Sequence, residues 1–144
     1  MSNHIFIAAS AVVFSACAAL PLLAKEETRI QATEILKSEQ TVLEQPIRYP
    51  EGQARITSVL LTLEPGQETG MHIHRVPVFG YMVEGELTVD YGEKGVRVYN
   101  AGDAVMEAVD WPHNGVNKTN APVKILAVFM GAEGVSNTEP VPPQ

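Results

Sequence analysis

Apolar and polar residues alternate in short runs through the middle of this chain, and each run ends at turn-forming residues. A period of two is typical of strands buried on one face. The runs predict strands at residues 55–63, 81–83, 86–91, 96–99 and 123–130. Gly92 and Gly95 separate the third and fourth runs, which predicts a hairpin. The last run is almost continuously apolar, as expected of a strand covered on both faces.

Strands of this length and spacing predict an all-β fold, either an antiparallel sandwich or a barrel. The chain has no internal repeat, which favours a single barrel over a tandem pair. Residues 32–43 are ambiguous, because Ala32, Ile35 and Leu36 also fit a helical period. Outside this stretch and the N-terminal residues no helical period is visible.

Composition divides the chain into three segments. Residues 1–24 contain no charged side chain and predict an export signal, and so a periplasmic or secreted protein. Two alternatives remain for this segment: an uncleaved membrane anchor, or a lipoprotein site at Cys17. Residues 25–135 mix charge with apolar runs and are expected to form the barrel. Residues 136–144 are polar and proline-rich, which predicts a disordered tail.

Charge and cysteine content exclude several classes of function. The net charge is −7, and no basic or aromatic-basic cluster is present, so nucleic acid is not an expected partner. Cys17 is the only cysteine and lies in the segment predicted to be removed. A chain processed at Ala24 therefore has no disulfide, no thiolate metal ligand and no cysteine nucleophile.

The histidines provide the strongest indication of chemistry. His4 lies in the N-terminal segment, and the other three are His72, His74 and His113. In a strand, residues two positions apart point to the same face, so His72 and His74 can converge on one point inside a barrel. Imidazole is the commonest transition-metal ligand, and His113 is the one remaining histidine that could complete a three-histidine site.

The spacing of these residues resembles the two motifs of the cupin superfamily over about residues 30–132. In the first motif a glycine precedes His-x-His by five residues, and a second glycine closes the motif; the matching residues are Gly66, His72, His74 and Gly85. In the second motif the matching residues are Gly102, His113 and Asn117. The resemblance implies a single double-stranded β-helix, or jelly-roll, barrel with the three histidines on one metal ion.

The sequence departs from the motifs at three positions. Val78 stands where the metal-binding glutamate is usual, and Ala108 and Asp110 replace a proline and a glycine. Three neutral imidazoles leave the charge of a divalent metal uncompensated, which favours an anionic ligand at the open positions. Such a site resembles those of cupin thiol and diketone dioxygenases, which implies iron; manganese, nickel and zinc remain alternatives. Loss of the carboxylate is also consistent with a weakened metal site.

Groups near the histidines in sequence are candidates for proton transfer or substrate binding. Glu107 and Tyr81 are the candidate catalytic residues, and Glu68 and Asp110 are further carboxylates to consider. Each of these side chains is also consistent with a solvated position on the outer face. Arg75 could hold an anionic substrate, or it could pair with surface acids at the rim.

These features lead to three hypotheses. The first is an exported metal-dependent enzyme, with a dioxygenase acting on a small molecule as the preferred form. The second is a non-catalytic module that binds a metal or small ligand, and the third is a metal-dependent isomerase or lyase. A homodimer formed through edge strands is a further expectation, with residues 28–50 as the candidate contact region.

Overall fold

The computed structural model describes residues 29–142, and residues from Thr33 onward form one compact unit. Residues 29–32 belong to a separate unit, are exposed and have no regular secondary structure. The prediction of an export signal at residues 1–24 lies outside the described residues. The elements in chain order are β1 (Ala54–Leu63), β2 (His72–Ile73), β3 (Val78–Glu84), β4 (Glu86–Asp90), the 3₁₀ turn η1 (Gly92–Lys94), β5 (Val96–Asn100), β6 (Ala104–Met106), β7 (Asn114–Val116), β8 (Val123–Ala132) and β9 (Glu139–Pro140).

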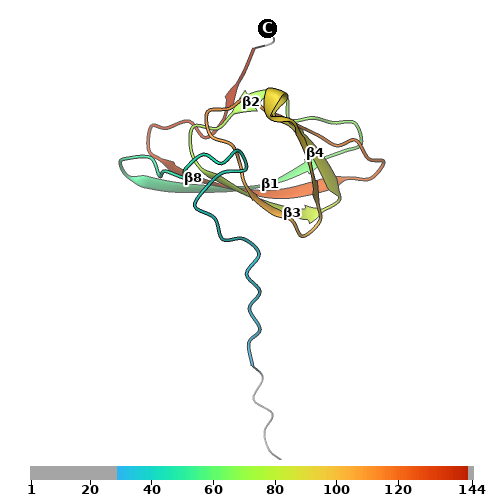
Figure 1. Ribbon diagram of the computed structural model, residues 1–144, viewed down its shortest axis with the longest axis horizontal. Coiled ribbons are helices and arrows are strands. Elements are labelled where there is room, and N and C mark those ends of the chain that lie inside the picture. The colour runs from blue at the N-terminus through green and yellow to red at the C-terminus, as the bar shows by residue number, and fades with distance from the viewer. Residues whose placement is uncertain (1–28, 143–144) are drawn as a thin grey trace, which may run out of the picture. The chain divides into compact units, whose positions relative to one another are not determined.

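The strands form three antiparallel sheets. The four-stranded sheet has the order β1-β8-β3-β6, the three-stranded sheet has the order β5-β4-β7, and β2 pairs with β9. Figure 1 looks along the barrel, with β1, β8 and β3 on one side and β4 on the other. This arrangement is an antiparallel jelly-roll barrel, so the predicted fold is confirmed. No helix in the described part of the chain is both long and apolar enough to cross a membrane.

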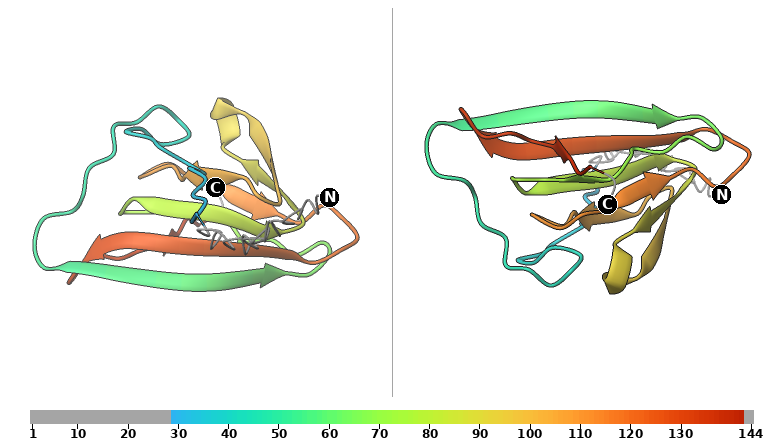
Figure 2. Two further views of the ribbon diagram at one scale, coloured as in Figure 1. Left: turned by 90° about the horizontal axis from the view of Figure 1, so that it is seen from below. Right: turned by 90° about the horizontal axis from the view of Figure 1, so that it is seen from above.

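All five predicted strands are observed, and their bounds differ from the prediction by up to three residues at either end. β4 and β5 pair directly through the turn at η1, which confirms the hairpin. β8 lies between β1 and β3 (Figure 2); it pairs with β1 along its whole length and with β3 from Lys124 to Phe129. One face of β8 is buried and the other is only partly covered, so its apolar run reflects a central position in the sheet more than complete burial.

The core consists of two apolar clusters between the sheets. The larger cluster contains buried side chains from both sides of the barrel, among them Leu63, Met82, Leu87 and the fully buried Tyr91. The smaller cluster surrounds Phe129 and Val78. The two clusters place an apolar lining on either side of the interior space in which the histidines lie.

Residues 32–43 form no helix; they are irregular and lead into a turn. Within this turn the Val42 amide donates to the Met106 carbonyl at 2.7 Å, so the turn continues the hydrogen bonding of β6. The Gln45 side chain donates to the Val109 carbonyl and accepts from the Val109 amide. The segment therefore covers the β6 edge of the four-stranded sheet, and polar pairing with the sheet overrides the weak helical period.

The prediction of a disordered tail is wrong for residues 136–142. Glu139 and Pro140 form β9, which pairs with β2, and the Val141 amide donates to the Met71 carbonyl at 2.9 Å. A proline-rich composition predicts disorder because it offers little apolar surface to bury. Here backbone pairing at a sheet edge, where proline is tolerated, holds the segment in place.

Several motif positions have left-handed backbones, and at two of them the surroundings or the residue type are informative. Gly85 has a φ of 81°, and a Cβ there would lie 2.7 Å from the Pro122 carbonyl oxygen, so only glycine fits. Asp110 occupies the position where cupins usually have glycine, and its φ is 53°. Aspartate tolerates this region better than most residues, so the departure preserves the backbone conformation.

Candidate metal centre

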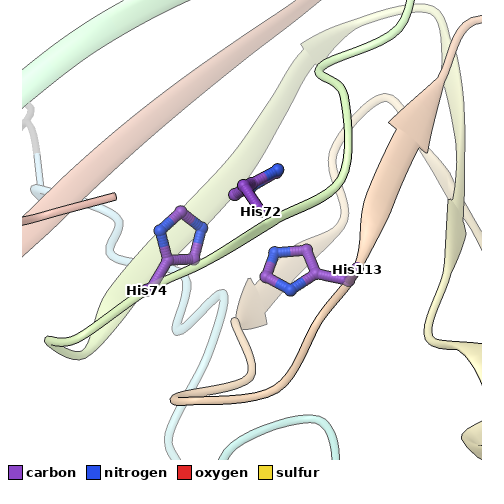
Figure 3. A group of neighbouring side chains, drawn as sticks. All are labelled: His72, His74 and His113. Carbon is purple, nitrogen blue, oxygen red and sulfur yellow. The ribbon is translucent and has the colours of Figure 1, made fainter. Parts of the chain in front are cut away.

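The two histidine windows are joined by their backbones. The His72 amide donates to the His113 carbonyl and the His113 amide donates to the His72 carbonyl, each at 3.0 Å. His74 follows β2 by one residue, and its carbonyl accepts from the Asp110 amide at 2.8 Å. One ring nitrogen from each histidine lies within 4.8 Å of the other two. Figure 3 shows the three rings gathered from two chain segments that are distant in sequence.

Hydrogen bonds fix which ring nitrogens are free. Nδ1 of His72 lies 2.7 Å from the Gly70 carbonyl, and Nδ1 of His113 lies 2.8 Å from the Trp111 carbonyl. Nδ1 of His74 lies 3.2 Å from the Asn137 carbonyl and 3.1 Å from the Thr138 hydroxyl. A carbonyl only accepts, so each Nδ1 carries the proton and donates. The lone pair of each ring is then on Nε2, which is the arrangement found when histidines bind a metal.

Burial favours the neutral form of His74 and His72. Burial, and then the neighbouring His113 and His72, lower the pKa of His74 to about 3. Burial also lowers the pKa of His72, against the opposing effect of the Gly70 hydrogen bond. The buried Nε2 of His113 has no hydrogen-bond partner among the described residues. An unsatisfied buried nitrogen beside two other neutral rings fits a divalent transition metal, which satisfies it by coordination.

Val78 leaves this centre without a carboxylate. Its side chain is buried and lines the interior beside the histidines, as the motif alignment predicts. Among the described residues, no Asp or Glu places an oxygen within 4.8 Å of the ligand atoms of all three histidines. The residues that could hold the metal are therefore His72, His74 and His113, and the protein contributes no negative charge to the ligand set.

A cavity of about 780 Å³ adjoins the three histidines. Glu107 and Glu68, two of the carboxylates expected near the site, both line it. Tyr81, the other candidate catalytic residue, is not among the lining residues; it pairs with Ala104 on β6, while its neighbours Gly80 and Met82 line the cavity. Alternation along β3 thus directs Tyr81 to the opposite face of the sheet.

The Glu107 carboxylate accepts hydrogen bonds from two neighbouring groups, and a third group supports one of these. Its Oε1 accepts from the Tyr91 hydroxyl and from the Ala108 amide, each at 2.8 Å. The hydroxyls of Tyr91 and Tyr99 lie 3.1 Å apart, and since Tyr91 donates to Glu107, Tyr99 donates to Tyr91. Burial, and then the charge of Glu107, raises the pKa of Tyr91 far above its ordinary value; burial raises the pKa of Tyr99 to about 12. Both tyrosines therefore remain protonated donors that fix Glu107.

The remaining charged candidates lie outside the centre. Arg75 pairs with Asp110 and Glu139 at 2.8 Å each, and none of the three lines the cavity. The hydrogen bond that Arg75 donates to Glu139 is the largest cause that raises the pKa of Arg75, followed by the one that it donates to Asp110. Of the two roles considered for Arg75, the structure supports pairing with surface acids at the rim. Glu68 accepts from the Asn114 side chain at 2.7 Å.

Sequence reasoning missed Tyr91, Tyr99 and Thr138. The alternation of Leu87, Val89 and Tyr91 was a usable signal, because it places Tyr91, directly after β4, on the same side as the buried Leu87 and Val89. Tyr99 is the partner of Leu87 in the hairpin register and so shares that face. Nothing in the polar C-terminal sequence indicates that Thr138 reaches a histidine.

Comparison with known proteins agrees with the motifs and the geometry. The sequence model of the cupin domain family matches residues 59–129, which include all three histidines. The chain is thus similar to the cupin domain family over these residues. A comparison with curated protein sequences finds no match.

Two solved cupin-like structures illustrate the breadth of the fold. The chain is 20% identical to an oxalate decarboxylase from Lactobacillus farciminis, with a TM-score of 0.53, over 62% of this chain and 27% of that one. It is 17% identical to a DMSP lyase from Ruegeria pomeroyi, with a TM-score of 0.54, over 62% of this chain and 44% of that one. The chain thus spans less than half the length of either protein, and at these identities the likeness shows the fold alone.

Proposed function

We propose that this protein is an exported metal-dependent enzyme that binds a divalent transition metal through His72, His74 and His113 and acts on a small molecule in the adjoining cavity. The observation that carries the proposal is the arrangement of the rings: every Nδ1 has an acceptor, which leaves three Nε2 lone pairs available together. We propose iron as the metal and a dioxygenase as the form of the enzyme. Manganese, nickel and zinc are the alternatives that metal analysis separates.

The chemistry that the metal supplies follows from the small ligand set. With three protein ligands it retains open positions, at which it polarises a bound group or, if it is iron, supports oxygen chemistry. The protein positions these ligands through the carbonyls of Gly70, Trp111 and Asn137. The lack of a carboxylate at Val78 leaves negative charge to be supplied by the ligand.

Among the described residues that line the cavity, Glu107 is our candidate for moving a proton. Its Oε1 is occupied by Tyr91 and the Ala108 amide, whereas Oε2 has no hydrogen bond to any described residue. A carboxylate that lines the cavity and is fixed on one oxygen can accept a proton from a bound molecule with the other. Tyr81 takes no part in this proposal, because it lies outside the cavity lining.

The same carboxylate supports the alternative of an isomerase or lyase, which needs a base and a Lewis acid but no oxygen. Oxygen uptake by anaerobically metal-loaded protein with thiols and diketones separates the alternatives. A dioxygenase consumes oxygen in proportion to product, and Glu107→Gln slows this without changing the metal content. Product formation without oxygen uptake contradicts the dioxygenase and supports the isomerase or lyase. Ligand binding without product formation, in the presence and in the absence of oxygen, supports the non-catalytic binding module.

Export and dimer formation are separate proposals. Cell fractionation tests export, because a protein retained in the cytoplasm contradicts it.

The edge strand β1 supports a homodimer, since none of the described residues pairs with its free side and Ile56 and Leu60 on it are 61% and 62% exposed. Residues 28–50 were the expected contact region, but the part from Thr41 to Ile47 hydrogen-bonds within its own chain. Light scattering then distinguishes a monomer, which contradicts the proposal, from a dimer.

A further inference from the structure

The walls of the cavity beside the histidines are mostly apolar. They are formed by aliphatic and aromatic side chains from both sides of the barrel, including Val59, Leu61, Val89, Val105, Ile125 and Phe129. The space of about 780 Å³ is much larger than a single coordinated water or a two-carbon acid requires. A ligand that fills it must cover apolar surface as well as reach the metal.

The charges around the cavity are of one kind. Apart from the three histidines, the ionisable side chains that line it are Glu68, Glu107 and Tyr99. None of the lining residues, all of them within the described part of the chain, is lysine or arginine. Arg75, the cation nearest to the histidines in sequence, is held by two acids and does not line the space.

These two observations restrict the ligand. A negatively charged head group is compensated if it coordinates the metal. A second carboxylate or phosphate on the same molecule meets no lysine or arginine among the lining residues, only neutral side chains and two carboxylates. Burial of a charge without an opposite charge as partner is costly. An apolar remainder meets walls that gain from covering it.

We propose that the ligand of this cavity is a small molecule with a single metal-coordinating head group and an apolar body, and that it carries no second negative charge. This inference rests on the proposed metal site and goes beyond it, because it concerns the part of the ligand that the metal does not touch. It separates this site from sites that take dianionic acids or phosphorylated sugars.

A matched series of hydroxamates tests the proposal. The Co²⁺-loaded protein is titrated with acetohydroxamate, hexanohydroxamate and the six-carbon analogue whose chain ends in a carboxylate, and binding is followed in the visible spectrum. Each buried methylene adds about fourfold in affinity when it is fully covered. Four added carbons should therefore tighten binding at least tenfold, and the terminal carboxylate should abolish that gain.

Two neighbouring leucines on β1 provide a variant and its control. Leu61 lines the cavity and is 39% exposed, so a charged side chain can replace it. Leu60 points to the other face of the sheet and does not line the cavity. Leu61→Arg should raise the affinity for the terminal-carboxylate probe at least fivefold, whereas Leu60→Arg should leave it unchanged. Leu60→Arg should also leave the affinity for acetohydroxamate unchanged.

The outcomes separate this proposal from the metal site. If the wild-type chain does not bind Co²⁺, or binds it no more tightly than His72→Ala does, the proposed metal site itself is contradicted. If Co²⁺ binds but affinity is independent of chain length, or the terminal carboxylate binds more tightly, only the apolar ligand class is wrong. Equal effects of Leu60→Arg and Leu61→Arg, or no hydroxamate binding to the Co²⁺-loaded protein, also overturn the ligand class. The wild-type series decides the question even if Leu61→Arg does not fold.

Discussion

The C-terminal segment should set metal affinity, although it supplies no metal ligand. Its backbone and side chain provide both acceptors of His74 Nδ1: the Asn137 carbonyl at 3.2 Å and the Thr138 hydroxyl at 3.1 Å. His72 and His113 are instead oriented by carbonyls within two residues of themselves. His74 is thus the one ligand of the three whose orientation depends on a distant part of the chain.

The size of the effect follows from how many acceptors are lost. Removal of an outer partner of a metal-binding histidine typically costs about 10-fold to 100-fold in affinity. Thr138→Val keeps the Asn137 carbonyl as an acceptor, so we expect a smaller loss of metal affinity, about threefold to tenfold. A chain that stops at Ser136 loses both acceptors and the pairing of β9 with β2, and we expect a loss of about 10-fold to 100-fold.

Competition for Zn²⁺ with a chromophoric chelator measures both changes, with circular dichroism as the check on folding. Glu139→Gln is the matched control, because it removes a charge from the Arg75 pair in the same segment without touching His74. That pair is exposed, so its loss should leave the Zn²⁺ affinity unchanged. Wild-type affinity in both Thr138→Val and the shortened chain would refute the role of the segment. An equal loss in Glu139→Gln would show that general docking of the segment, and not its contact with His74, is what matters.

Three further predictions concern proton transfer, the backbone and pH. Glu107→Gln should lower kcat by about 100-fold or more while the metal content measured by mass spectrometry stays constant; a proportional loss of metal would assign Glu107 a structural role instead. Gly85→Ala should lower the free energy of unfolding in urea by at least about 2 kcal/mol more than Gly92→Ala does. Both glycines have positive φ, but only at Gly85 would a Cβ meet a backbone oxygen, that of Pro122. Equal losses in the two variants would contradict this close approach. Burial lowers the pKa of His74 to about 3 in the folded protein, so below pH 6.5 the unfolded chain takes up a proton that the folded chain does not. The metal-free protein should therefore lose up to about 1.4 kcal/mol of stability per pH unit below 6.5 through this group, and an undiminished slope in His74→Asn would contradict that origin.

The predicted strands succeed where alternation and turn residues agree. The run before Gly85 and the hairpin around Gly92 each have a period of two and a glycine whose positive φ the turn requires. These are local properties of the sequence, so they can be read without knowing the contacts. The spacing of His72 and His74 is also a local property of the sequence. That His113 lies beside them is not local; the resemblance to the cupin motifs predicted it, and the backbone hydrogen bonds between His72 and His113 agree with it.

The features that sequence reasoning missed depend on contacts between distant segments. β9 forms because β2 offers a free edge, and nothing in the composition of residues 136–142 indicates that edge. The assignment of Tyr81 as a cavity residue failed because sequence proximity does not specify the face of a strand, whereas alternation from Met82 would have placed it outside. Tyr91 had a signal in alternation, but its contact with Glu107 joins two sheets and required the structure.

Metal analysis of protein purified without oxygen, together with His72→Ala and His113→Ala, tests the three-histidine centre. We predict about one transition-metal ion per chain in the wild type and loss of this ion in both variants, with folding retained, because no carboxylate of the described residues stands close enough to replace a missing ring. Stoichiometric metal that survives both substitutions would contradict the assignment of His72, His74 and His113 as the metal ligands.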